Sequence, residues 1–111
     1  MAQLALNKIQ TVTLDITTSD QTPYTAPTGY TSIVLYAHVT NVSSTAATFT
    51  MSHVRSSTTT EIIKDASVPP ADAYVPLDGK LVLETSDYIV AEAGANTTLK
   101  ILLSVLETAN A

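Results

Sequence analysis

Two histidines, His38 and His53, are the side chains best suited to bind a transition metal. They fall on predicted strands that follow each other in the chain, so the two imidazoles could approach each other across a hairpin. A zinc site would need a third ligand, for which Asp15 and Glu61 are the acidic candidates. Nothing in the spacing brings such a ligand to the pair. The sequence therefore predicts no metal site, and a half-buried hydrogen-bonding role is favoured for each histidine.

Three aspartates, Asp72, Asp78 and Asp87, lie in predicted turns, where calcium ligands are often found. They do not form a spaced loop of the Asp-x-Asp-x-Asp-Gly type. A turn aspartate usually hydrogen-bonds its own backbone. We therefore expect no calcium site and no cofactor.

The residues of a catalytic triad occur in the chain, but not in a catalytic pattern. The sequence has no Gly-x-Ser-x-Gly nucleophile elbow. The carboxylates of Glu84 and Asp87, or of Glu92 and Glu107, would hydrolyse a glycoside only at a defined separation in a cleft. With one Phe and no Trp, the chain also lacks the usual sugar-stacking walls. We therefore predict that the protein is not an enzyme.

The aromatic residues leave a binding function open as the alternative. A β-sandwich could recognise a receptor or a surface glycan through its tyrosines, although tyrosine is also common where one end of a side chain is buried and the other is wet. Clustering on one exposed rim would favour binding, whereas dispersal or burial would favour packing and assembly. Tyr24, between two prolines, is expected to lie flat over a sheet end. The five tyrosines are Tyr24, Tyr30, Tyr36, Tyr74 and Tyr88.

The composition favours strands and a partly covered surface. Of 111 residues, 45% are hydrophobic and only 14% are charged, against about 25% charged in average soluble domains. Abundant Thr, Val, Ile and Tyr suit a pleated sheet. Because charge is depleted at the cores of interfaces, the low charge suggests that much of the surface contacts other proteins.

The charge balance and the termini exclude several classes of partner. The net charge is −5 with only five Lys and Arg in total, so we expect no nucleic-acid binding. No apolar run is long enough for a membrane span. The segment 1–8 has neither the charged nor the long apolar region of a signal peptide, so we expect the protein to stay in the cytoplasm or to leave by another route.

About eight short strands separated by turn residues predict the fold. We expect an all-β chain that forms a single antiparallel β-sandwich, jelly-roll-like, with an extended N-terminal arm. Residues 1–18 would be the arm and first strand, and residues 19–111 the remainder of the same domain. In the first strand Ile9 is out of phase with Val12, Leu14 and Ile16, which suggests a bulge near Gln10.

The segment from Gly79 to Glu107 organises this prediction, because it reads as three strands of an antiparallel meander. In its last strand one face is purely aliphatic and is predicted to be core, since side chains alternate with period two: Leu99, Ile101, Leu103 and Val105. The other face mixes polar with apolar residues: Lys100, Leu102, Ser104 and Leu106. Either a partner or the N-terminal arm covers that second face, or the strand is central and buried on both sides.

A set of ordered motifs resembles a known family over residues 23–107. The motifs are Tyr24–Leu35, Asn41-Val42, Ile63–Asp65, Val68–Pro70, Leu77–Glu84, Ser86-Asp87 and Ser104–Glu107. Together they resemble the small β-sandwich virion structural proteins of tailed bacteriophages, especially contractile-tailed phages of cyanobacteria. In that family the turn before the penultimate strand is typically Gly-Asp. The serine that stands there in this chain can take that backbone position, at small cost if its φ stays negative.

The resemblance implies an assembly role without catalytic residues. It implies a protein that self-associates, as a trimer or hexamer, and docks on other virion proteins in the neck, tail, baseplate or capsid surface. It would reside in the virion, and in the host cytoplasm during assembly. From the faces described above, the predicted contact residues are Leu4, Leu6, Tyr36, Leu102 and Leu106.

Overall fold

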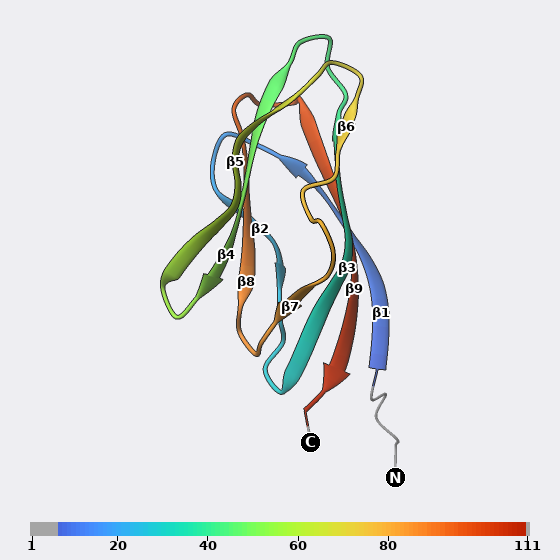
Figure 1. Cartoon of the computed structure of the whole chain (residues 1–111), viewed down its shortest axis with the longest axis vertical. Helices are drawn as coiled ribbons and strands as arrows, with labels where there is room; N and C mark the ends of the chain where they lie inside the picture. The colour runs from blue at the N-terminus through green and yellow to red at the C-terminus, as the bar shows by residue number, and fades with distance from the viewer. Residues whose placement is uncertain (1–6, 111) are drawn as a thin grey trace.

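The computed structural model describes residues 7–110 as two antiparallel sheets that pack face to face (Figure 1). Strand-rich composition and short turns produce this all-β architecture, and the predicted β-sandwich is confirmed. No helix in the described part of the chain is long and apolar enough to cross a membrane. The strands are β1 (Asn7–Ile16), β2 (Gln21–Thr25), β3 (Tyr30–Asn41), β4 (Ala47–Arg55), β5 (Thr58–Val68), β6 (Ala73–Tyr74), β7 (Leu81–Leu83), β8 (Tyr88–Ala93) and β9 (Leu99–Ala109).

The strand order is that of a jelly roll. The five-stranded sheet runs β1-β9-β3, with β6 and β7 both paired to the far side of β3, and the four-stranded sheet runs β2-β8-β4-β5. Strand β6 pairs with Val39 and Thr40, while β7 pairs with the segment 32–34. These two very short strands therefore share one edge position, so the nine strands occupy the eight positions expected from the sequence.

Strand β9 supplies the centre of the core and lies between β1 and β3. The four aliphatic residues predicted for its core face are at most 1% exposed. Each such burial stabilises the fold by about 1.5–3 kcal/mol. On the opposite face Leu102, Ser104 and Leu106 are half-buried and Lys100 is exposed. The strand is therefore central in its sheet, but a single chain does not bury its second face.

Strand β1 pairs with β9 without interruption, from Asn7 opposite Thr108 to Ile16 opposite Leu99. The bulge expected near Gln10 is therefore wrong. Ile9 is out of phase with the core residues because it points to the outer side of the sheet, where it is 70% exposed.

Two bulged strands depart from simple alternation. In β3 the register to β9 shifts between Val34 and Tyr36, so that Leu35 and Tyr36 are both exposed and Ala37 returns to the core.

The strand predicted at residues 61–66 is longer, because β5 already pairs at Thr58 opposite Arg55. The intervening hairpin loop is only two serines, both with positive φ, instead of a longer polar tip.

Candidate protein interface

A row of aliphatic side chains crosses the outer face of the five-stranded sheet. In neighbouring strands, residues directly opposite each other lie on the same face and form one line across the sheet. At the ends of the line, Ile9 is 70% exposed and Val82 is 52% exposed. The line runs across β1, β9, β3 and β7 through Ile9, Leu106, Ile33 and Val82, and we call these four residues the aliphatic row.

The predicted contact residues that the structure describes lie on this same face. Leu106 belongs to the aliphatic row, and Leu102 lies opposite His38 on β3. Tyr36 lies opposite Ser104, and its ring stacks on that of His38 with centroids 5.9 Å apart. Leu4 and Leu6, the other two predicted contact residues, lie outside the described residues. The sequence analysis missed Ile9, Ile33 and Val82, although the odd phase of Ile9 was a signal.

The five-stranded sheet is electrically neutral. Its strands contain four charged residues, and these form two ion pairs, Lys8–Glu107 and Asp15–Lys100, each at 3.2 Å. Since the chain has ten acidic and five basic residues, removing two of each leaves the whole net charge of −5 on the rest of the molecule. A second protein can therefore approach this face without repulsion from a net charge.

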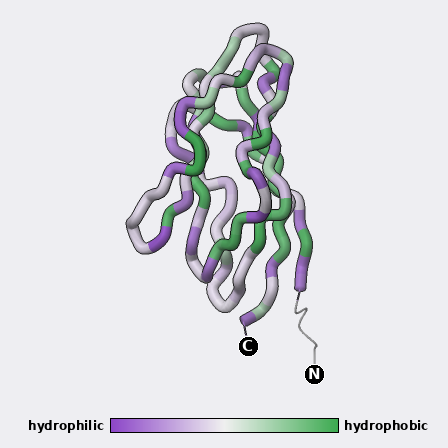
Figure 2. The backbone as a smooth tube through the Cα atoms, in the orientation of Figure 1, coloured by the Kyte–Doolittle hydropathy of each residue, from purple (hydrophilic) through white to green (hydrophobic). Residues whose placement is uncertain are grey.

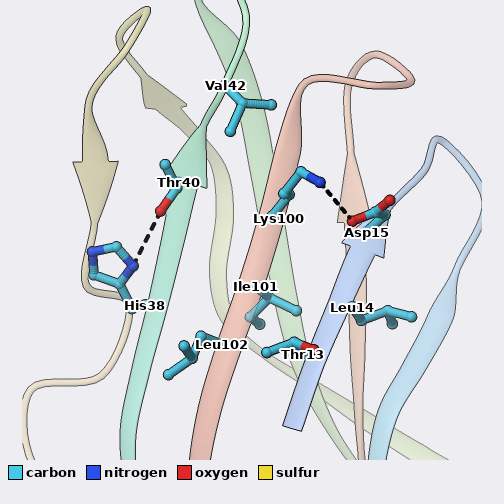
Figure 3. Close-up of a pocket in the computed structure, with 9 residues that line it drawn as sticks. All are labelled: Thr13, Leu14, Asp15, His38, Thr40, Val42, Lys100, Ile101 and Leu102. Atoms are coloured by element: carbon cyan, nitrogen blue, oxygen red, sulfur yellow. Dashed lines mark hydrogen bonds and ion pairs between the residues drawn. The ribbon is translucent and has the colours of Figure 1, made fainter.

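An open depression lies on the same face, between β3, β9 and β1 (Figure 3). Its floor is apolar around Leu102, and its rim is polar. At the rim Lys100 pairs with Asp15, and the Thr40 hydroxyl lies 3.2 Å from His38 Nδ1. These polar groups are already bonded to one another. The depression is therefore suited to receive an apolar side chain of a partner. Its lining is Thr13, Leu14, Asp15, His38, Thr40, Val42, Lys100, Ile101 and Leu102.

The two histidines do not meet. His38 is on β3 in one sheet and His53 is on β4 in the other, so the expected approach across a hairpin is wrong. Within residues 7–110, no group of three or more His, Cys, Asp or Glu side chains is arranged to hold a metal ion.

His53 instead belongs to a charged cluster around Asp87 at the start of β8. The Arg55 guanidinium donates to both carboxylate oxygens of Asp87, at 3.0 and 2.7 Å, and the Glu84 backbone N–H donates at 2.9 Å. His53 Nε2 lies 3.1 Å from the same carboxylate. The hydrogen bonds from Arg55, reinforced by those from Glu84 and His53, lower the pKa of Asp87 to about 2. These hydrogen bonds stabilise the turn between β7 and β8.

Within that turn Ser86 adopts a φ of 72°. The condition for a small cost, a negative φ, is therefore not met, and this serine occupies the left-handed region that a glycine would take without strain. The turn holds it there, because the Ser86 N–H donates to the Ala26 carbonyl at 3.0 Å and the Asp87 N–H donates to the Glu84 carbonyl at 2.9 Å.

A second polar cluster is buried between the sheets. Tyr24 is 7% exposed, so its expected position flat over a sheet end is wrong. Its hydroxyl donates to the buried Glu107 carboxylate and lies 2.7 Å from the Ser32 hydroxyl, while the Gln10 amide donates to the carboxylate at 2.9 Å. Burial, with the Glu107 contact, raises the pKa of Tyr24 to about 12. One sequence signal could have indicated this cluster: Glu107 continues the period-two core face of β9, so its carboxylate needed a buried partner.

The tyrosines do not gather on one rim. Tyr24 is inside the sandwich, Tyr36 is on the outer face of the five-stranded sheet, and Tyr88 lies half-buried on β8 of the four-stranded sheet. Tyr74 packs against the core. By the criterion set from the sequence, this dispersal favours packing and assembly over a glycan-binding surface.

The chain matches no protein-family model and no curated protein sequence. It is similar in structure to a capsid chain of Helicobacter pylori bacteriophage KHP30, with a TM-score of 0.56 and 14% identity over 96% of this chain and 90% of that chain. It is also similar to a chain of the T13 particle of infectious bursal disease virus, with a TM-score of 0.54 and 9% identity. That match covers 96% of this chain but only 32% of the viral chain.

A non-viral domain has the same architecture. The nucleoplasmin-like N-terminal domain of Drosophila FKBP39 matches with a TM-score of 0.52 and 12% identity, over 99% of this chain and 98% of that chain. At such identities these likenesses establish a shared β-sandwich fold alone.

Proposed function

We propose that the protein is a non-enzymatic structural component of a tailed-bacteriophage virion, which associates with copies of itself and docks on neighbouring virion proteins. The observation that carries this proposal is the neutral outer face of the five-stranded sheet, with its aliphatic row. The resemblance of residues 23–107 to phage structural proteins supports the viral assignment. The β-sandwich shared with the KHP30 capsid chain and with the bursal disease virus particle adds to that support.

The outer face favours a contact role on energetic grounds. Removing apolar surface from water contributes about 25 cal/mol per Å². A sheet face that stays in water is normally polar. The two most exposed members of the aliphatic row, Ile9 and Val82, would gain most from a partner. Contiguous apolar surface of this kind typically marks a protein contact.

The proposal assigns contact roles to Leu4, Leu6, Tyr36, Leu102 and Leu106, with residues 1–18 and 19–111 belonging to one domain. A trimer or hexamer in the neck, tail, baseplate or capsid surface follows from the family resemblance. The site of action is then the virion, after assembly in the host cytoplasm.

The test is to replace Leu102 and Leu106 together by Ser and to measure the mass in solution by light scattering. Both side chains are half-buried on the outer face, so we expect the variant to fold and to lose self-association. The matched control is Val90→Ser, a half-buried residue on the outer face of the four-stranded sheet, which should keep the native mass. A folded double variant that still assembles would overturn the assignment of this face.

A further inference from the structure

Strand β1 offers a free sheet edge. Among the described residues it pairs only with β9, so the backbone groups on its other side have no strand partner. In Figure 1 it forms the lateral border of the five-stranded sheet. It is ten residues long, contains no proline and is not bulged. Such an edge is a template for pairing with another chain.

Strand β5, one edge of the four-stranded sheet, is protected in the ways that natural sheets use. Its register to β4 shifts twice, and Asp65 has a φ of 52°. It also carries Glu61 and Lys64, both exposed. Bulges and exposed charges prevent edge-to-edge pairing. Strand β1 also carries two exposed charges, Lys8 and Asp15, but each of them forms an ion pair with β9.

The aliphatic row ends at this free edge. Its terminal member, Ile9, is the most exposed large hydrophobic residue among those described. Among the described residues its cross-strand neighbour is Leu106, on the β9 side. A strand added at the free edge would place a side chain beside Ile9 on its other side, at the same level along the strand.

We propose that β1 pairs antiparallel with β1 of a second copy, about a two-fold axis that passes beside Ile9 and is perpendicular to the sheet. The inference deepens the self-association in the proposed function and rests on it; of the two assemblies named there it requires the hexamer, built from dimers, because a trimer has no two-fold axis. A two-fold axis makes one surface serve both copies. It sets Ile9 against the second copy's Ile9, and the aliphatic rows of the two copies become one continuous row. In the same register Lys8 faces Gln10 and Asn7 faces Thr11, so no like charges are opposed.

Cysteine cross-linking tests this register directly, because the chain contains no cysteine. Opposed residues in an antiparallel pair have Cα atoms about 4.5–5.5 Å apart, within the range of a disulfide. We expect Ile9→Cys to form covalent dimers under mild oxidation. The control is Thr13→Cys, exposed on the same face of β1. The two copies of residue 13 would be roughly 26 Å apart, at about 3.3 Å per residue, and should not cross-link.

Two outcomes would overturn the inference. One is cross-linking of Thr13→Cys at least as fast as that of Ile9→Cys. The other is the absence of Ile9→Cys dimers in a protein that light scattering shows to be oligomeric; in that case self-association stands and this pairing fails. A native chain that is monomeric at every concentration would overturn both the self-association and the pairing of β1.

A charge at each edge provides the second test. Ile9→Lys should abolish pairing while leaving the unfolding midpoint near that of the dissociated native chain at low concentration, because the side chain is mostly exposed in the single chain. Thr59→Lys, on the protected edge strand β5, should leave the solution mass unchanged. Loss of mass in Thr59→Lys with retention in Ile9→Lys would contradict the proposed edge.

Discussion

The outer faces of the two sheets differ although they belong to one sandwich. The five-stranded sheet presents a surface without net charge, which the aliphatic row crosses. The four-stranded sheet presents threonine and acidic side chains, and Figure 2 shows the hairpin between β4 and β5 mostly in near-white, with a purple segment. A depression on this second face is lined by Asp20, Thr50, Ser52, Thr59, Glu61, Lys64, Asp65, Val90 and Glu92.

This difference separates what folds the chain from what it contacts. Both sheets bury an aliphatic inner face, as the sandwich requires, so the inner faces say little about function. Only one outer face has the polarity that a solvated sheet needs. The other keeps an aliphatic row that the fold of a single chain does not require, which points to a partner.

The largest effect is expected from the core side of β9. Leu103→Ala should lower the free energy of unfolding by about 2–5 kcal/mol, because a fully buried leucine leaves a cavity. Its neighbour Leu102 points to the outer face and is only half-buried. Leu102→Ala should therefore cost much less in the dissociated protein. Urea unfolding at low protein concentration measures both, and equal losses would contradict the distinction between the two faces.

The next largest effect is expected from the charged cluster around Asp87, whose contribution to stability depends on pH. Asp87→Asn should lower the free energy of unfolding at neutral pH by about 1–3 kcal/mol, because it breaks the part-buried, charge-assisted hydrogen bonds to a buried carboxylate. The folded pKa of Asp87, about 2, lies below its ordinary value of 3.8. Its stabilising contribution is therefore present above about pH 4 and is lost as the pH falls toward 2.

Acid titration of the native chain and of the Asn variant checks this expectation. The stability difference between them should shrink across that pH window. A difference that stays constant down to pH 2 would mean that the charge of Asp87 does not stabilise the turn.

The smallest effect on stability, but a decisive one for the comparison, comes from one lysine on each outer face. Surface substitutions usually change stability by no more than about 0.5 kcal/mol. Ser104→Lys lies between Thr11 and Tyr36 on the aliphatic side, and Val90→Lys lies on the polar side. We expect only Ser104→Lys to reduce the solution mass. A reduced mass in Val90→Lys alone would show that the interface is on the four-stranded sheet and would contradict our assignment.

The sequence was sufficient to predict the sandwich and the core of β9, because both depend on period-two alternation within single strands. The odd phase of Ile9 was wrongly attributed to a bulge. Within a single strand, an apolar residue that points to the outer face gives the same pattern as a bulge that shifts the alternation. The true bulge, between Val34 and Tyr36, follows no residue pattern that alternation reveals. The aliphatic row could not be predicted, because its four residues lie on four different strands and are brought into line only by the register of the sheet.

The polar clusters were beyond prediction for a related reason. The partners Arg55 and Asp87 are 32 positions apart, and Tyr24 and Glu107 are 83 apart. Only the strand order brings them together. Ser86 accepts a left-handed conformation because long-range backbone hydrogen bonds hold its turn, and no local propensity indicates this.

The most direct test of the central claim is the mass of the native chain in solution, measured by light scattering over a range of concentrations. An outer face that binds a second copy through its aliphatic row predicts a particle whose mass is at least twice that of the 11.7 kDa chain. A monomer at every concentration would contradict self-association through this face.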